Sequence, residues 1–213
     1  MAVEVKICGI NDEDSMDAAI EAGADYVGLV FFPPSPRAVT PEQAAELVEF
    51  APGEVTKVGL FVDPDDATLD RVLTRVRLDL LQLHGHESPE RIEAIRLEYG
   101  LPVMKVISVA GLDDLAAAEP YLAVTDRLLF DAKPPRGAVL PGGNAVSFDW
   151  TILTGRKWGV PWMLAGGLTP ANVAEALRIS GALAVDVSSG VESAPGVKDA
   201  DKIRAFIQAV RGA

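Results

Sequence analysis

Short apolar runs alternate with stretches of helical hydrophobic periodicity along the whole chain. A strand buried on both faces reads as a brief apolar run, whereas an amphipathic helix repeats its apolar positions every three to four residues. On this basis we predict strands at residues 3–8, 26–31, 57–62, 78–84, 103–108, 127–131, 161–165 and 182–188. Helices are predicted between and after them, at residues 13–22, 41–50, 67–76, 89–98, 112–122, 148–154, 170–179 and 200–210.

Several of these helices open with a start signal. Thr40-Pro41, Ser88-Pro89 and Thr169-Pro170 each place a capping residue before a proline. Proline suits the first helical position because its missing N–H would have no partner there. These signals support the alternation of strands and helices.

Strands that alternate with helices predict a parallel sheet. Eight such units in 213 residues favour a closed (β/α)8 TIM barrel, an α/β fold, at the compact end of its size range. An open doubly wound sheet is the rival, but it usually carries a Gly-rich nucleotide loop after its first strand, and Cys8-Gly9-Ile10-Asn11 is not one. Because no Ser/Gly-rich or Pro-rich linker interrupts the chain, we predict one domain, residues 1–213.

Composition and charge exclude several classes of partner. The net charge of −12 argues against nucleic acid and anionic membrane surfaces as partners, since both need a basic face. No apolar run reaches the roughly 18 residues of a membrane span, and no export signal opens the chain. With one cysteine, this predicts a cytoplasmic protein. Two histidines and one cysteine, scattered along the chain, show no metal-ligand spacing.

The only cysteine, Cys8, ends the first predicted strand, and Asp131 ends the sixth. An arbitrary single cysteine is usually a small buried hydrophobe. Barrel active sites, however, gather at the C-terminal ends of the strands, and a proton acceptor and a proton donor there form a site hypothesis. The other residues expected at this rim are Arg37, Asp63, His84, Gly166, Gly167, Ser188, Ser189 and Gly190.

The loops after strands 7 and 8 are the usual phosphate site of this fold. Gly166-Gly167 lets the backbone approach an anion, and Ser188-Ser189-Gly190 adds hydroxyls and amides. A tight turn and a helix cap are the structural alternatives for these motifs. Their occurrence at both expected places favours phosphate binding.

Side-chain alternation places further residues inside the barrel. If Cys8 faces the lumen, so does Lys6, and Asp186 shares a face with Ser188, so Lys6 and Asp186 are expected to pair across neighbouring strands. Gln82 and His84 share an inward face as well. His84 is either a pocket donor or a rim histidine, and Arg37 is either a carboxylate clamp or a solvated loop residue.

Six motifs stand in order along the chain, and together they are specific. They are Lys6-Ile7-Cys8-Gly9, Phe32-Pro33-Pro34-Ser35-Pro36-Arg37, Gln82-Leu83-His84-Gly85, Phe148-Asp149-Trp150, Ala165-Gly166-Gly167-Leu168 and Asp186-Val187-Ser188-Ser189-Gly190-Val191-Glu192. In this the chain resembles the phosphoribosylanthranilate isomerases of tryptophan biosynthesis, over essentially its whole length. One departure is Gly142-Gly143-Asn144-Ala145, where the family often has Gly-Gly-Thr-Gly; the conformation of residues 133–147 is therefore left open.

The resemblance implies an Amadori rearrangement of N-(5′-phosphoribosyl)anthranilate, a small anionic substrate, without metal or cofactor. It implies Cys8 as general base, Asp131 as general acid and Arg37 as anthranilate anchor. The remaining substrate-binding residues are His84, Gly166, Gly167, Asp186, Ser188, Ser189 and Gly190. We expect a monomer or a homodimer.

Two alternatives remain at this point. A related phosphosugar barrel, such as the isomerase of histidine biosynthesis, would share the phosphate site but is expected to carry Asp rather than Cys after strand 1. A non-catalytic sensor of phosphate ligands would need no acid and base.

Overall fold

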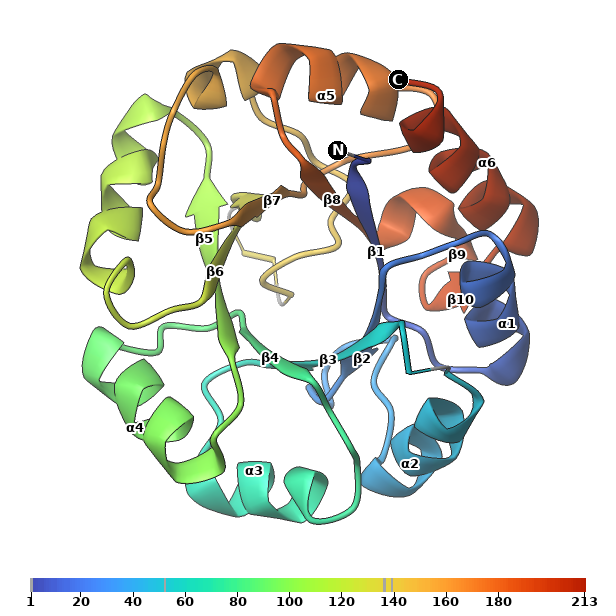
Figure 1. Ribbon diagram of the computed structural model, residues 1–213, viewed down its shortest axis with the longest axis vertical. Coiled ribbons are helices and arrows are strands. Elements are labelled where there is room, and N and C mark those ends of the chain that lie inside the picture. The colour runs from blue at the N-terminus through green and yellow to red at the C-terminus, as the bar shows by residue number, and fades with distance from the viewer. Residues whose placement is uncertain (1, 52, 136, 139) are drawn as a thin grey trace.

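Eight parallel strands close into a barrel in the computed structural model, which describes residues 2–51, 53–135, 137–138 and 140–213 (Figure 1). Neighbours in sequence pair with one another, and the last strand pairs with the first. The predicted (β/α)8 barrel is confirmed. Its strands are β1 (Glu4–Cys8), β2 (Tyr26–Val30), β3 (Thr56–Phe61), β4 (Leu80–Leu83), β5 (Val103–Val109), β6 (Arg127–Ala132), β7 (Trp162–Leu164) and β8 (Ala184–Val187).

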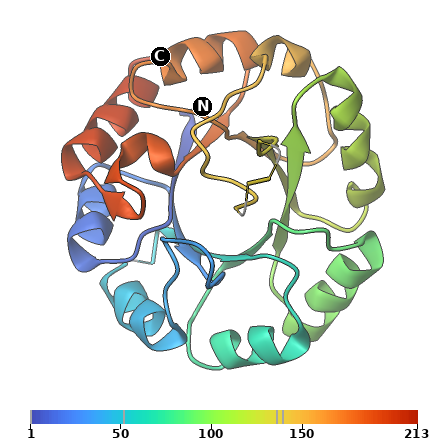
Figure 2. The same cartoon turned by 180° about the vertical axis from the view of Figure 1, so that it is seen from behind.

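Helices form a ring around the strands (Figures 1 and 2). They are α1 (Glu13–Glu21), α2 (Pro41–Phe50), α3 (Asp66–Leu73), α4 (Pro89–Tyr99), α5 (Val173–Ser180) and α6 (Ala200–Arg211). Two of the three predicted starts are confirmed, since Thr40 and Ser88 cap α2 and α4 by accepting from backbone N–H groups three residues on. The third is wrong: α5 begins after Asn172, whose side chain accepts from the backbone of Thr169.

Two predicted helices are 3₁₀ segments, η1 (Leu112–Tyr121) and η2 (Trp150–Leu153). Pro120 lies inside η1 and has no N–H to donate, which opposes a regular α-helix there. Only four residues are helical in η2. A short 3₁₀ turn, η3 (Ser189–Val191), and a two-stranded hairpin, β9 (Glu192–Ala194) with β10 (Val197–Lys198), were not predicted.

Alternation along each strand creates two layers of core. Outward residues such as Val5 and Ile7 pack against the helices in the large apolar cluster. Inward residues fill the barrel: Tyr26, Val58, Leu80, Met104, Val106, Leu129, Met163, Ala165 and Ala184 form a second cluster. The lower barrel is thus packed solid, which leaves its C-terminal end for a ligand.

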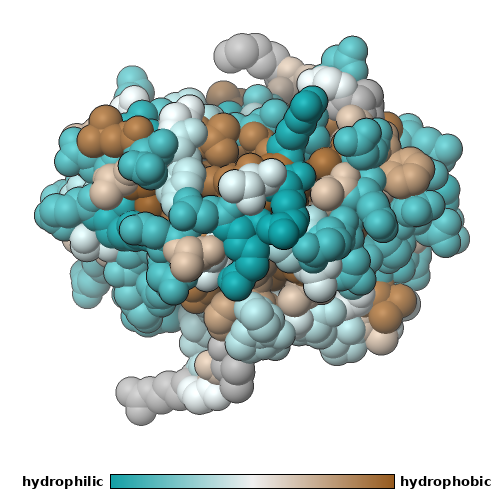
Figure 3. Space-filling view, turned by 90° about the horizontal axis from the view of Figure 1, so that it is seen from below, coloured by the Kyte–Doolittle hydropathy of each residue, from teal (hydrophilic) through white to brown (hydrophobic). Residues whose placement is uncertain are grey.

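The two ends of the barrel differ. In Figure 2 the segment that follows β6 lies across the barrel opening, at the end where the strands finish. The flank over α3 is largely hydrophilic, with scattered apolar patches (Figure 3). Within the described ranges, no helix is long and apolar enough to cross a membrane.

Candidate active site

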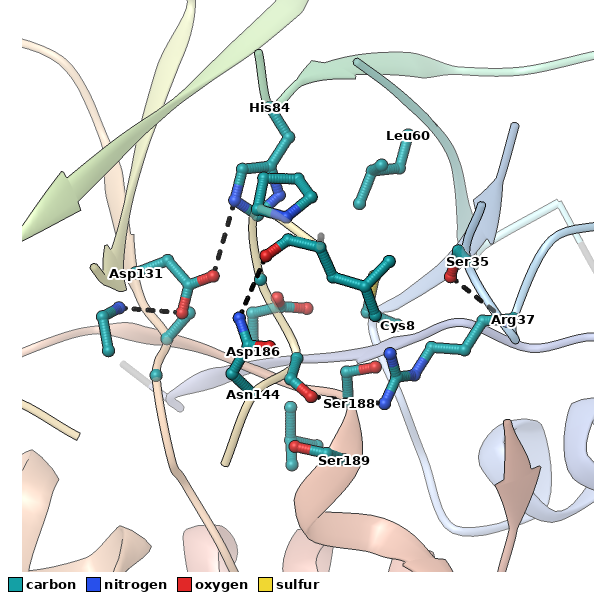
Figure 4. A pocket seen from close by; sticks show the side chains of 18 of the residues that line it. Cys8, Ser35, Arg37, Leu60, His84, Asp131, Asn144, Asp186, Ser188 and Ser189 are labelled. Atoms are coloured by element: carbon teal, nitrogen blue, oxygen red, sulfur yellow. Dashed lines mark hydrogen bonds and ion pairs between the residues drawn. The ribbon is translucent and has the colours of Figure 1, made fainter. Parts of the chain in front are cut away.

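A pocket lies at the C-terminal end of the barrel, and all of the residues predicted at this rim except Asp63 line it (Figure 4). Cys8 comes from β1 and Arg37 from the loop after β2, while His84 follows β4 and Asp131 ends β6. Gly166 and Gly167 follow β7, and Asp186, Ser188, Ser189 and Gly190 come from β8 and the turn after it. Asp63 does not line this pocket; its carboxylate instead accepts from the backbone N–H of His86.

Lys6 and Asp186 form the predicted ion pair inside the barrel. The two residues are register partners on β1 and β8, and Lys6 Nζ lies 2.8 Å from Asp186 Oδ1. The Lys6 side chain is fully buried. Burial opposes its charge, but Asp186 and, less strongly, Cys8 together outweigh burial and raise the pKa of Lys6 above its ordinary value. The lysine therefore carries its charge within the barrel.

Cys8 lies beside this lysine. A Cβ added at Gly28, opposite Cys8 on β2, would lie 3.0 Å from Cys8 Sγ and 3.2 Å from Lys6 Nζ, so both groups crowd one point that a glycine leaves open. Burial raises the pKa of the thiol, while the cations of Lys6 and Lys198 oppose that shift. The resting group is the thiol, next to a cation that stabilises its thiolate.

Asp131 is held toward its protonated form. Burial, followed by the nearby Asp186 carboxylate, raises the pKa of Asp131 to about 7. Its Oδ1 accepts from the backbone N–H of Ala132 at 2.9 Å, and its Oδ2 lies 3.5 Å from His84 Nε2. A carboxylic acid with such a pKa can donate a proton near neutral pH.

His84 is a neutral pocket residue. Burial, with the cations of Lys105 and Lys6, lowers the pKa of His84 to about 3, so its ring does not compete with Asp131 as a cation. The backbone of Pro141, in the segment over the pocket, partly opposes this lowering of the pKa. Nε2 is buried and has no hydrogen-bond partner within the described ranges, so it is open to a ligand or to the Asp131 proton.

Glycines let the segment of residues 140–146 approach the acid. A Cβ at Gly142 would lie 2.5 Å from Asp131 Oδ2 and 2.6 Å from His84 Cε1. At Gly143, where φ is +71°, a Cβ would lie 2.7 Å from Arg37 Nη1. The segment thus contacts the acid and the arginine with its backbone, which the sequence alone did not reveal.

Arg37 is buried and paired, so the solvated alternative is wrong. Its Nε and Nη2 donate to the two carboxylate oxygens of Glu192 at 2.7 and 2.9 Å. Beside it, Val30, Phe32, Leu60 and Val62 give the pocket an apolar wall. A cation next to an apolar wall suits an aromatic carboxylate.

The loops after β7 and β8 present backbone to the pocket. Gly167 has φ of +64°, and a Cβ there would lie 2.8 Å from the backbone of Val146. The carbonyl of Gly167 accepts from the Asn172 side chain at the start of α5. Backbone N–H groups beside a helix start form the arrangement that binds phosphate in this fold.

Two residues beside the pocket, Glu192 and Lys198, were not predicted as site residues. Glu192 and Lys198 lie beyond the last strand, in a hairpin with no apolar alternation. Gln82 was placed inward, but its Oε1 is buried without a partner in the described part of the chain, and it lines the pocket. In the same part, no group of three or more His, Cys, Asp or Glu side chains is placed to hold a metal ion.

Known proteins resemble this chain over its full length. The family model of N-(5'phosphoribosyl)anthranilate (PRA) isomerase matches residues 5–209. The N-(5'-phosphoribosyl)anthranilate isomerase of Paramagnetospirillum magneticum is 87% identical over 212 residues, covering 100% of this chain and 99% of that protein. The enzyme of the same name from Rhodospirillum rubrum is 59% identical over 211 residues, covering 97% of each.

Solved structures agree. The phosphoribosyl anthranilate isomerase from Thermotoga maritima is 37% identical with a TM-score of 0.89, over 99% of this chain and 100% of that one. Another, in complex with reduced 1-(o-carboxyphenylamino)-1-deoxyribulose 5-phosphate, is 36% identical with a TM-score of 0.85, over the same shares of the two chains. A barrel with this pocket, matched across its length by the family model and by close relatives, belongs to the N-(5′-phosphoribosyl)anthranilate isomerase family.

Proposed function

We propose that this pocket catalyses the isomerisation of N-(5′-phosphoribosyl)anthranilate to 1-(2-carboxyphenylamino)-1-deoxyribulose 5-phosphate, with Asp131 as general acid and Cys8 as general base. The observation that carries the assignment is the placement of both groups in one pocket, with the pKa of Asp131 raised to about 7. The family membership favours this reaction over the histidine-pathway isomerase and over a non-catalytic sensor.

The chemistry asks for one acid and one base. Proton donation to the ring oxygen of the sugar lets the C1–O bond break and leaves an iminium at C1. Removal of the proton from C2 then gives an enolamine, which tautomerises to the ketone. No electron leaves the substrate, so the reaction consumes no redox cofactor, and we propose that none is used.

Asp131 supplies the first proton. Burial favours its neutral form, and its Oδ2 faces the pocket beside His84 (Figure 4). Donation leaves a carboxylate whose Oδ1 keeps the backbone N–H of Ala132. That hydrogen bond stabilises the charge that forms.

Cys8 takes the second proton. The Lys6 ammonium stabilises the thiolate form of Cys8 against the cost of burial. The iminium formed after ring opening makes the C2 proton more acidic and brings a positive charge toward the thiol. The positive charge favours loss of the thiol's own proton to solvent, and the thiolate of Cys8 then takes the acidified C2 proton.

The rest of the pocket holds the two anionic ends of the substrate. We assign the anthranilate carboxylate to Arg37, with the ring against Val30, Phe32 and Leu60. We assign the phosphate to backbone N–H groups of Gly166, Gly167, Ser188, Ser189 and Gly190. His84 and Asp186 line the same pocket, and we assign them to the sugar.

We further propose that residues 1–213 act as one domain in the cytoplasm, as a monomer or a homodimer. The small-molecule chemistry needs no partner chain. The solved relatives include mutually generated monomers of the dimeric phosphoribosylanthranilate isomerase from Thermotoga maritima, which supports both states as candidates for this chain.

The test is turnover of N-(5′-phosphoribosyl)anthranilate by the purified protein, followed by loss of the substrate's anthranilate fluorescence. We expect saturable conversion to the deoxyribulose product. Binding of the substrate without conversion would contradict the enzyme assignment. Conversion that survives loss of both Cys8 and Asp131 would contradict the residue roles.

A further inference from the structure

Glu192 is surrounded by hydrogen-bond donors beside the pocket. One carboxylate oxygen accepts from Arg37 Nε at 2.7 Å and from Lys198 Nζ at 2.7 Å. The other accepts from Arg37 Nη2 at 2.9 Å and from the backbone N–H of Gly196 at 3.2 Å. The Glu192 side chain is only 4% exposed and that of Lys198 is fully buried. Glu192 does not itself line the pocket.

The two cations on Glu192 belong to opposite parts of the proposed site. Arg37 comes from the loop after β2, in the part assigned to the anthranilate carboxylate. Lys198 Nζ donates to the backbone carbonyl of Ser188 at 3.1 Å, in the part assigned to phosphate. One carboxylate therefore connects the two anion-binding parts of the pocket.

The contact with Glu192 also fixes which side of Arg37 is open. A guanidinium offers two edges for bidentate contacts, Nε with Nη2 and Nη1 with Nη2. Glu192 occupies the first edge. On the second edge, Nη2 makes one long hydrogen bond, 3.5 Å, to the carbonyl of Gly143. Nη1 has no hydrogen-bond partner in the part of the chain that the structure describes, and it lies against the pocket-lining Gly143. The second edge is thus presented to the pocket.

We propose that Glu192 is a positioning residue for substrate binding: it holds the guanidinium of Arg37 so that its Nη1–Nη2 edge meets the carboxylate of the substrate. This inference rests on the binding role proposed for Arg37. Held by two hydrogen bonds, the arginine loses little further freedom when a ligand binds, which favours affinity.

The direction in which ligand affinity changes when Glu192 is neutralised distinguishes a positioning role from a purely electrostatic one. Arg37, Lys198 and Glu192 together carry a net charge of about +1. Neutralising Glu192 makes this cluster more positive, so electrostatics alone would tighten binding of a doubly anionic ligand. Loss of positioning weakens binding instead.

The experiment measures the dissociation constant of reduced 1-(o-carboxyphenylamino)-1-deoxyribulose 5-phosphate by calorimetry. For Glu192→Gln we expect about tenfold weaker binding, within the usual range of coupling between neighbouring polar residues. Glu192→Asp keeps the charge but shortens the side chain, and it should weaken binding as well. KM should rise in both variants with a smaller change in kcat, because Glu192 does not reach the reacting atoms.

Arg37→Ala completes a double-mutant cycle. In that background Glu192→Gln should no longer weaken binding, since there is no guanidinium left to orient. A general defect of the hairpin would instead weaken binding in both backgrounds. Glu21→Gln on α1, which loses a 3.8 Å exposed ion pair with Arg204, is the matched control and should bind as the parent does.

The outcomes separate the proposed role of Arg37 as carboxylate anchor from the proposed role of Glu192 in positioning it. If Arg37→Ala weakens binding but Glu192→Gln and Glu192→Asp bind as tightly as the parent or more tightly, the positioning role is wrong and the Arg37 anchor stands. If Arg37→Ala itself leaves binding unchanged, the anchor is wrong, and the role of Glu192 is wrong with it.

Discussion

Asp131 and Cys8 are both buried, and burial pushes both toward the protonated form. For an acid that must donate a proton, this is the form needed at neutral pH. For a base it is a cost, which the cations of Lys6 and Lys198 partly offset. Burial therefore suits Asp131 as an acid directly. It is compatible with Cys8 as a base only because the two cations lie near the thiol.

Replacing Cys8 with alanine tests the base. We expect kcat to fall roughly 10²-fold or more, as for loss of a general base, while the affinity for the reduced product analogue stays close to that of the parent. Steady-state kinetics and calorimetry provide the two values. Near-parental turnover would show that Cys8 only fills space.

Asp131 makes the stability of the fold depend on pH. Its pKa is raised from 3.8 to about 7 in the folded state, so between these values the folded protein holds a proton that the unfolded chain releases. This aspartate's contribution to stability therefore falls as pH rises from about 4 to 7 and stays low above that. Asp131→Asn carries no such charge.

The asparagine variant should gain stability relative to the parent as pH rises. The difference between pH 4 and pH 8 is at most on the order of 4 kcal/mol, from the size of the shift. Urea unfolding of both proteins at the two pH values measures it. A gain that is the same at both pH values would show that Asp131 is ionised in the folded protein.

At the scale of elements, barrel closure depends on the contact between β1 and β8, where Lys6 pairs with Asp186. Lys6→Met leaves the Asp186 carboxylate without its partner. We expect a loss of about 3–5 kcal/mol in the free energy of unfolding, as for a broken buried ion pair. Urea unfolding is the measurement.

The double variant Lys6→Met/Asp186→Leu is the control. It removes both charges and should recover much of the stability, because a buried ion pair often contributes little beyond an apolar pair. If Lys6→Met alone costs nothing, the Asp186 carboxylate is satisfied by another group.

The loop after β7 tests the phosphate assignment. Gly167→Val places a branched side chain at a φ of +64°, against the backbone of Val146. Both strain and loss of the close approach should weaken binding of the reduced product analogue by about tenfold or more. Ser189→Ala should be milder, since it keeps the backbone N–H. The reverse order would argue that hydroxyl groups hold the phosphate.

The elements themselves were largely predictable. Buried parallel strands read as short apolar runs, and all eight appear within a residue or two of their predicted ends. The predictions were less accurate outside the barrel strands. An apolar period is present over residues 112–122, but Pro120 favours a 3₁₀ segment, and the β9–β10 hairpin is too short to show alternation.

The predicted site residues share one property: each ends or closely follows a strand. The barrel brings strand ends together at one rim, so topology alone converted a set of scattered residues into a pocket. Glu192 could not be placed this way, because its role depends on a contact with Arg37, 155 positions away along the chain. The approach of Gly142 to Asp131 likewise depends on a loop without periodicity.

On the scale of the whole molecule, the charge of the chain and of the pocket differ in sign. The chain carries a net charge of −12. Inside it, the charge of Lys6 is balanced by Asp186, whereas the two cations Arg37 and Lys198 share the single carboxylate of Glu192. A net positive cluster is thus buried beside the pocket of an acidic protein. Specific capture of an anionic ligand then depends on this local arrangement and not on long-range attraction.

In the proposed mechanism, a neutral Asp131 delivers the proton that opens the sugar ring. The most direct test compares kcat of the parent and Asp131→Asn with their affinities for the reduced product analogue. We predict that kcat falls by roughly 10²-fold or more while the dissociation constant stays within about threefold of the parental value. Near-parental kcat in Asp131→Asn, which cannot donate a carboxylic proton, would show that Asp131 is not the general acid.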